Sequence, residues 1–242
     1  MSQAKNHRRC GKGKFYGVGV GPGDPELLTV KALKALEHCP VWAVPKTRQG
    51  NSLALEIINK ALKTEGKEIL FLDFLMTRDK EKLEENHEKN AAEIAAFLEQ
   101  GKDVAMANIG DVSVYSTFSY IHEKVAASGY ATEVVPGIPS FCAAAAKLKV
   151  SLTEMGKPLH IIPAGEDGLA ENLALAGTRV LMKSGKELPR VKKALKEAGL
   201  WQKAAMAVNC GLPGEKLYPC LEEEEMDEAG GAGYFSVILV KE

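Results

Sequence analysis

The sequence predicts an α/β protein built from two consecutive units, and three observations support that prediction. Short apolar runs of strand length alternate with helix-period patterns along most of the 242 residues. Glycine, proline and aspartate cluster directly after three of these runs, as they do where a strand turns into a helix. The alternation pauses near residue 150 and then restarts. We therefore expect a flexible basic tail over residues 1–13, an N-terminal α/β domain over 14–148, a linker over 149–157 and a C-terminal α/β domain over 158–242.

The composition is that of an ordinary globular protein, with 45% apolar and 26% charged residues. The net charge of −1 gives no overall field that favours nucleic acid. No apolar run approaches the roughly 20 residues of a membrane span, and the basic start of the chain lacks the apolar core of a signal peptide. The five cysteines and five histidines are dispersed, so we expect neither a disulfide framework nor a metal site. These features favour a cytoplasmic protein that binds neither nucleic acid nor membrane.

In the first unit, an apolar strand at 15–20 runs into the turn Gly21-Pro22-Gly23-Asp24-Pro25. A helix follows from about Leu28, with Asp24 or Thr29 as its cap. Ser52 or Asn51 caps the next helix. Further strands are expected at 41–44, 68–72, 103–107 and 132–135, and further helices at 53–62, at 79–100, from about 113 and at 141–148.

In the second unit, strands are expected at 159–163, 179–182, 204–208 and 234–240, with helices at 167–175 and 188–198. The acidic stretch 222–228 is expected to be a solvated loop.

Two histidines of the first unit need a separate interpretation. His87 shares the apolar face of its helix and is expected to be a partly buried structural residue. His122 is interpreted as an ordinary surface histidine, with a base or a metal-side contact as the alternative.

The turn at Gly21–Pro25 is a candidate ligand site, because ligands of α/β proteins bind at the carboxyl ends of strands. Neither the dinucleotide fingerprint nor the P-loop pattern fits it. Phosphate loops point backbone N–H groups at the anion, whereas Pro22 has no N–H and Asp24 adds a negative charge. A plain structural turn is the alternative. Two further turns, Gly110–Asp111 and Pro136–Ser140, are expected at the same sheet edge, which favours a single shared site.

Three motifs, taken together and in order, resemble the tetrapyrrole methylases, the S-adenosylmethionine-dependent enzymes of corrin and siroheme synthesis. The motifs are VGVGPGDPELLT at 18–29, GDVSVYSTFSY at 110–120 and EVVPGIPSFCAAAA at 133–146. The likeness is greatest to the branch that methylates carbon 20 of precorrin-2 or cobalt-factor II. It is strong over residues 14–148 and weaker through TRVLMK at 178–183 and GLPGEKLY at 211–218.

That resemblance implies the two-domain tetrapyrrole methylase fold, in which each domain is a sheet flanked by helices. It also implies a homodimer, a tetrapyrrole substrate, and S-adenosyl-L-methionine bound in the interdomain cleft. The cofactor contacts that it implies are Gly21, Pro22, Gly110, Asp111, Val114, Pro139, Ser140, Met182, Ala207, Asn209 and Tyr234. The chain departs from the family where Val112 replaces a common proline and where Asn209-Cys210 replaces charged residues, so the C-terminal half of the site departs more.

S-adenosyl-L-methionine contains no phosphate, which agrees with a turn poor in N–H groups, and Asp111 is a candidate acceptor for its ammonium group or a ribose hydroxyl. Methyl transfer depends on alignment more than on acid or base groups, so no catalytic residue is assigned. Candidates for the substrate trough are Asp24 and the predicted polar helix face of Tyr115, Ser116, Thr117, Ser119 and Tyr120, with a merely solvated face as the alternative. Two other functions stay open: methylation of another ring carbon, and binding of a tetrapyrrole or of the cofactor without turnover.

Overall fold

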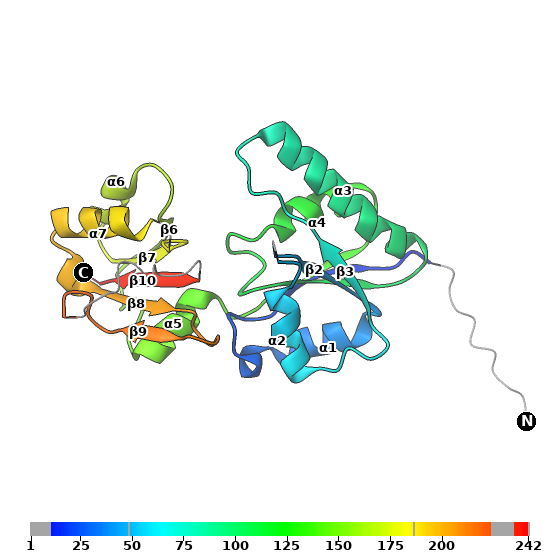
Figure 1. The fold of residues 1–242 in the computed structure, drawn as a ribbon, viewed down its shortest axis with the longest axis horizontal. Helices are drawn as coiled ribbons and strands as arrows, with labels where there is room; N and C mark the ends of the chain where they lie inside the picture. Colours follow the sequence, from blue (N-terminus) through cyan, green and yellow to red (C-terminus); the bar gives the residue numbers. More distant parts are fainter. Residues whose placement is uncertain (1–10, 48, 186, 224–234, 242) are drawn as a thin grey trace, which may run out of the picture. The chain divides into compact units, whose positions relative to one another are not determined.

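The computed structural model describes residues 11–47, 49–185, 187–223 and 235–241 (Figure 1). It contains two five-stranded sheets with helices against them, so the α/β prediction is confirmed. The chain divides into two compact units. The first consists of the residues up to Gly21 together with Pro25–Gly137, and the second consists of Pro22–Asp24 together with the chain from Ile138 onward. The proposed linker at 149–157 stays a prediction, and the acidic stretch 222–228 lies mostly outside the described residues.

The first sheet has the strand order β3-β2-β4-β1-β5, and all four strand pairings are parallel. The pairing register places Gly19 opposite Asn108 and Pro45 opposite Leu72, so neighbouring strands end level with one another. The turns that follow these strands therefore start from one edge of the sheet. The strands are β1 (Phe15–Gly19), β2 (Val41–Pro45), β3 (Glu68–Leu72), β4 (Val104–Asn108) and β5 (Thr132–Val135).

Helices cover both faces of this sheet, as parallel strands with helical crossovers require. Figure 1 shows α1 and α2 on one face and α3 and α4 on the other. Leu36 and Ile57 belong to the apolar core on the first face, and Ile94 and Ile121 belong to the core on the second. The helices are α1 (Val30–His38), α2 (Leu53–Ala61), α3 (Lys80–Glu99) and α4 (Phe118–Ala127).

Two of the predicted helix caps are confirmed. The Thr29 side chain accepts a hydrogen bond from the N–H of Ala32 at 3.0 Å, and the Ser52 side chain accepts one from the N–H of Leu55 at 3.4 Å. Each cap pairs one of the N–H groups that the first turn of a helix leaves without a partner.

The predicted start of α4 is wrong. The helix begins at Phe118 and not near Ser113, because a turn occupies the residues between them. The Asp111 carboxylate accepts the N–H of Ser113 at 2.8 Å, and Tyr115 has a left-handed backbone with φ of 48°. The Ser116 hydroxyl then accepts the N–H of Phe118 at 3.1 Å. Of the predicted polar helix face, Ser119 and Tyr120 lie on α4, whereas Tyr115, Ser116 and Thr117 precede it.

The second sheet is mixed and has the order β6-β7-β10-β8-β9. β6 and β7 are parallel, and the remaining pairs are antiparallel. α6 and α7 share one apolar core with the sheet, and α5 packs against β8, β9 and β10. The sequence did not predict β9, which is only three residues long and not fully buried. The elements are α5 (Ser140–Leu148), β6 (Leu159–Pro163), α6 (Leu169–Leu173), β7 (Thr178–Met182), α7 (Leu188–Glu197), β8 (Ala204–Val208), β9 (Lys216–Tyr218) and β10 (Ser236–Val240).

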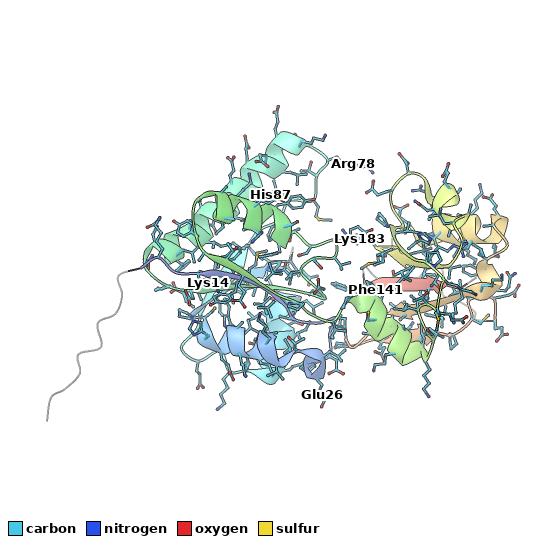
Figure 2. All side chains as sticks on the ribbon, turned by 180° about the vertical axis from the view of Figure 1, so that it is seen from behind. Lys14, Glu26, Arg78, His87, Phe141 and Lys183 are labelled. Carbon is cyan, nitrogen blue, oxygen red and sulfur yellow. The ribbon has the colours of Figure 1, made fainter. Side chains whose placement is uncertain are left out.

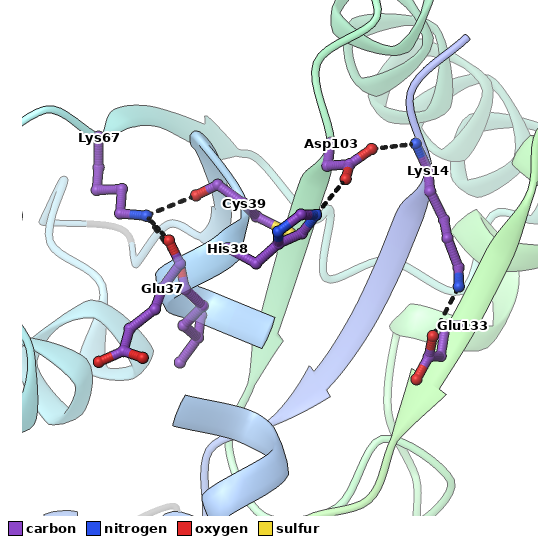
Figure 3. Close-up of polar contacts among 8 residues, drawn as sticks. Lys14, Glu37, His38, Cys39, Lys67, Asp103 and Glu133 are labelled. Carbon is purple, nitrogen blue, oxygen red and sulfur yellow. Dashed lines mark hydrogen bonds and ion pairs between the residues drawn. The ribbon is translucent and has the colours of Figure 1, made fainter. Parts of the chain in front are cut away.

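A polar network joins the amino ends of three strands of the first sheet (Figure 3). The Asp103 carboxylate, directly before β4, accepts the N–H of Lys14 at 2.6 Å and pairs with His38 at 2.7 Å. The ammonium groups of Lys14 and Lys31 lie 2.7 and 2.8 Å from the Glu133 carboxylate on β5. The hydrogen bond from Lys14 and then that from Lys31 lower the pKa of Glu133 to about 2. This network lies at the amino ends of the strands, opposite the edge where the turns gather.

Lys67 closes the C-terminal end of α1 (Figure 3). Its ammonium group donates to the backbone carbonyls of Leu36 at 3.0 Å, Glu37 at 2.6 Å and Cys39 at 2.9 Å. The last carbonyls of a helix lack partners within the helix and carry partial negative charge. A half-buried cation at this position therefore stabilises the helix and fixes it next to β3.

Replacing Lys67 with methionine is expected to lower the free energy of unfolding by about 1–3 kcal/mol, because three carbonyls lose a charged donor. Urea unfolding of the Lys67→Met variant measures this change. Lys63→Met is the matched control, since Lys63 is exposed on the same segment. Equal midpoints for the two variants would contradict the capping role.

Candidate functional site

The turns after β1 and β4 are joined by backbone hydrogen bonds at the carboxyl edge of the first sheet. The N–H of Gly110 donates to the carbonyl of Gly21 at 2.7 Å, and the N–H of Gly21 donates to the carbonyl of Gly110 at 3.2 Å. The turn after β5 joins them, because the N–H of Gly137 donates to the Asp111 carboxylate at 2.8 Å. The prediction that three turns gather at one edge is confirmed for the residues that belong to the first unit.

The backbones of these turns approach one another more closely than side chains would allow. A Cβ atom on Gly19 would lie 2.5 Å from the nitrogen of Gly137, and one on Gly137 would lie 2.2 Å from the oxygen of Gly110. Both distances are far below van der Waals contact, so only glycine fits at either position. The result is a junction in which backbone packs directly on backbone, with Gly19, Gly21 and Gly110 buried and Gly137 partly exposed.

Asp111 holds this arrangement in place, and its side chain is only 8% exposed. One carboxylate oxygen accepts the N–H and the hydroxyl of Ser113, and the other accepts the N–H of Gly137. Burial opposes ionisation of Asp111, but these hydrogen bonds outweigh it and lower the pKa of the carboxyl group. Because both oxygens already accept hydrogen bonds from the protein, Asp111 acts first as a brace between two turns. Its predicted contact with the cofactor stays a prediction.

The loop from Val112 to Thr117 contains the predicted substrate candidates. The Ser116 hydroxyl donates to the side-chain oxygen of Asn108 at 3.1 Å and accepts the N–H of Phe118, so the structure itself uses it. Tyr115 is 43% exposed, while Val114 and Thr117 are half-buried. Of the three trough candidates in this loop, Tyr115 is therefore the one whose side chain is most open to a substrate.

In the second unit, the strand register places two predicted cofactor residues level with each other on either side of β10. Met182 at the end of β7 and Ala207 in β8 both pair with Val237 of β10, one on each side. Both strands run antiparallel to β10, so they end at the same edge of the sheet. Directly after β8, the N–H of Asn209 donates to the carbonyl of Phe235 at 2.8 Å. Tyr234, the last predicted contact, lies outside the described residues.

The remaining predicted residues of the second unit lie in two turns. Asp24 packs against the turn after β8, because a Cβ atom on Gly211 would lie 2.6 Å from the nitrogen of Asp24. Pro22 belongs to the same short segment. Pro139 and Ser140 form the start of α5, where the carbonyl of Pro139 accepts the N–H of Cys142 at 3.0 Å.

Left-handed backbone conformations mark the same loops. Among the described residues, the non-glycine residues with positive φ are Tyr115, Lys149, Lys183 and Asn209. Lys149 directly follows α5, where helices commonly end in this conformation. Each of the other three lies in a loop after a strand: Tyr115 and Asn209 are predicted site residues themselves, and Lys183 directly follows Met182. Backbone strain of this kind persists where the surrounding structure requires it and is common at functional sites, which supports the assignment of these loops.

The two histidines of interest lie away from the joined turns. His87 is buried on α3 as predicted, with its ring stacked on Tyr120 at 4.8 Å between centroids, and burial lowers the pKa of its imidazole. The His122 ring is 2.9 Å from the hydroxyl of Thr132, which begins β5 at the end opposite the Gly137 turn. That placement disfavours His122 as a base. Within the described residues, no group of three or more potential metal ligands is found, and no helix is long and apolar enough to cross a membrane.

Comparison with known proteins decides the family. The profile of the Tetrapyrrole (Corrin/Porphyrin) Methylases matches residues 14–224. The chain belongs to this family. A relative from Salmonella typhimurium, named cobalt-precorrin-2 C(20)-methyltransferase, is 35% identical and covers 94% of this chain and 96% of its own length. A Methanocaldococcus jannaschii protein, named probable cobalt-precorrin-2 C(20)-methyltransferase, is 41% identical over 71% of this chain and 72% of its own. A Sinorhizobium protein, named precorrin-2 C(20)-methyltransferase, is 32% identical over 95% of this chain and 96% of its own length.

Solved structures of the family share the fold. A cobalt precorrin-4 methyltransferase superposes with a TM-score of 0.71 at 23% identity, covering 94% of each chain. A Thermus thermophilus uroporphyrin-III C-methyl transferase complexed with S-adenyl homocysteine gives a TM-score of 0.68 at 22% identity, covering 95% of this chain and 98% of its own. At these identities the likeness concerns the fold alone.

Three residues that shape the site were not in the predicted set. Gly19 allows the backbone contact, Ser113 donates twice to Asp111, and Asn108 accepts from Ser116. For Asn108 the available sequence signal was a polar residue at the end of an apolar strand, since a buried polar side chain there needs a partner.

Replacing Asp111 with asparagine is expected to lower the free energy of unfolding by about 1–3 kcal/mol near pH 6, because an amide cannot accept all of these hydrogen bonds. The folded pKa of Asp111 is lowered, so its contribution is complete above the unfolded value of about 3.9 and is lost as the pH falls through the folded value. The difference between wild type and variant therefore shrinks towards pH 3. Urea unfolding at both pH values measures it. Glu65→Gln is the control, since Glu65 is exposed. If the free energy of unfolding differs between wild type and Asp111→Asn by the same amount at both pH values, the role of Asp111 as a brace is contradicted.

Proposed function

We propose that this protein transfers the methyl group of S-adenosyl-L-methionine to carbon 20 of precorrin-2 or cobalt-factor II, a step of cobalamin biosynthesis. The observation that carries the proposal is the 35% identity to a cobalt-precorrin-2 C(20)-methyltransferase over nearly the whole length of both chains. Two further relatives with a carbon-20 name, at 41% and 32% identity, support the same reaction.

The hydrogen bonding at the joined turns suits a cofactor without phosphate. The N–H groups of Gly21 and Gly110 are used in their mutual bridge, and that of Gly137 is used by Asp111. The N–H groups of Val20 and Ser113 are also paired, and Pro22 has none. A phosphate needs several free N–H donors, and these paired groups supply none. Adenine and ribose faces, by contrast, can pack against a backbone surface.

The proposed cofactor residues come from both units. Gly21, Gly110, Asp111 and Val114 belong to the first, and Pro22, Pro139, Ser140, Met182, Ala207, Asn209 and Tyr234 to the second. When bound, S-adenosyl-L-methionine supplies an electrophilic methyl group. The part of the protein is to hold both reactants in a fixed geometry, which can contribute roughly 7–11 kcal/mol to catalysis. The close backbone packing of the joined turns suits that task, because it fixes the positions of the turns relative to one another.

Tyr115, Ser116, Thr117 and Asp24 remain proposed substrate residues, with Tyr115 the most exposed of those in the loop before α4. The homodimer and the cytoplasmic location that the sequence suggested are also proposals.

The purified protein is expected to add one methyl group to precorrin-2 or cobalt-factor II and to release S-adenosylhomocysteine. Mass spectrometry detects both products, and NMR of the isolated tetrapyrrole locates the new methyl group. A reaction without S-adenosyl-L-methionine is the control. A methyl group on another ring carbon would contradict the carbon-20 assignment. Binding of both ligands without any product would instead favour the non-catalytic binding protein.

A further inference from the structure

The segment between β3 and α3, Asp73–Asp79, exposes large side chains and is called here the β3–α3 arm. Leu75 is 47% exposed and Met76 is 76% exposed. Arg78 is exposed as well, and it has no ion-pair partner among the described residues. Figure 2 shows Arg78 on the loop that leads into α3 and His87 within that helix. The arm therefore presents two neighbouring apolar side chains and a guanidinium group to solvent.

Two buried amides hold the arm in place. Asn90 and Asn86 lie one turn apart on α3, and both are at least nine-tenths buried. Their amide groups donate to the carbonyl of Asp73 at 2.8 and 3.1 Å, and the Asn86 oxygen accepts the N–H of Leu75 at 3.3 Å. Buried amides are costly unless they are satisfied, and these are satisfied by the arm. The backbone at the start of the arm, from Asp73 to Leu75, is therefore held in place, while the side chains of Leu75, Met76 and Arg78 are exposed.

The arm starts from the same sheet edge as the joined turns. All five strands of the first sheet run the same way, and Leu72 ends β3 level with the end of β2. β3 lies two strands from β4, which corresponds to about 10 Å at ordinary strand spacing. Ring contacts connect the arm to α4: Phe74 of the arm lies 6.4 Å from the His87 ring on α3, which in turn stacks on Tyr120 of α4.

The charges on the arm leave one cation without a partner. Asp73 lies 3.7 Å from the ammonium group of Lys46, and Asp79 caps α3 and pairs with Lys82 at 3.2 Å. The acidic groups are thus matched, whereas Arg78 is not. A guanidinium group binds a carboxylate through two parallel hydrogen bonds. The arm consequently offers an apolar surface with a carboxylate-binding group beside it.

We propose that Leu75, Met76 and Arg78 of the β3–α3 arm bind the tetrapyrrole substrate. The two apolar side chains contact the ring system, and Arg78 pairs with a carboxylate on the ring periphery. Asn86 and Asn90 are positioning residues that hold the arm for this contact. The inference rests on the proposed function, because a macrocycle rimmed with carboxylates is the ligand whose chemistry matches these groups.

The test is equilibrium binding of cobalt-factor II, followed by its absorbance, to wild type and to Arg78→Gln. The variant is expected to bind about fivefold more weakly, the effect of losing one partly exposed ion pair. Arg78→Lys restores part of the affinity, and the affinity for S-adenosylhomocysteine stays unchanged in both variants. Lys60→Gln is the matched control, since it removes one exposed positive charge from α2 on the opposite face of the same sheet.

The positioning role of Asn90 is tested with the Asn90→Leu variant. This variant is expected to raise the KM for cobalt-factor II and to leave both the KM for S-adenosyl-L-methionine and kcat near wild type. A purely structural role of Asn90 would lower the melting temperature without this selective change in KM, and would contradict the positioning role.

The outcomes distinguish the proposal for the arm from the proposed function. If wild type methylates cobalt-factor II and Arg78→Gln binds it equally well, the proposal for the arm is overturned and the proposed function stands. If wild type binds the tetrapyrrole, Arg78→Gln binds it more weakly and no methylated product forms, the proposed function is overturned and the proposal for the arm stands. Dissociation of a dimer by Met76→Glu, measured by light scattering, would show that the arm is covered by a second copy and would overturn the proposal. Failure of wild type to bind either cobalt-factor II or precorrin-2 overturns both proposals.

Discussion

Close contact between backbones is the constraint on which the candidate site depends. Gly19, Gly110 and Gly137 meet at distances that leave no room for a Cβ atom, and Asp111 ties the turns after β4 and β5 together. One consequence is chemical, because the N–H groups of Gly21, Gly110 and Gly137 already donate to acceptors within these turns and are not available to a phosphate. The other is mechanical, because turns that pack backbone against backbone have little room to move. Both properties suit a reaction that depends on alignment of two bound molecules.

Most of the fold was predictable because its signals are local. The bounds of β3, β5, β6 and β8 match the predicted strands, and Thr29 and Ser52 cap their helices as expected, since strand periodicity and capping depend on a few neighbouring residues. The start of α4 was missed because short-range hydrogen bonds of side chains compete with helix formation. The Asp111 carboxylate accepts the N–H of Ser113 and the Ser116 hydroxyl accepts that of Phe118, and these turns replace the first helical turn that the apolar spacing suggested. β9 was missed because three residues are too few for a period.

The site shows a division between local and tertiary information. The glycines and prolines of the turns predict a ligand edge and argue against a phosphate loop, and the combined motifs indicated the family to which the chain belongs. The brace formed by Asp111, the shared partner of Met182 and Ala207, and the amides that hold the β3–α3 arm depend on pairings between distant segments. No local pattern contains those pairings. They came only with the three-dimensional structure.

The most direct test of the account is the affinity for S-adenosylhomocysteine, measured by calorimetry on Gly137→Ala. A methyl group there meets the carbonyl of Gly110 and must push the turns apart, whereas Gly11→Ala, the control, meets nothing within 4 Å. The account predicts at least a tenfold loss of affinity, or about 1.4 kcal/mol, for Gly137→Ala and no loss for the control, with both variants folded by circular dichroism. Wild-type affinity in a folded Gly137→Ala protein would contradict the claim that the joined turns form the cofactor site.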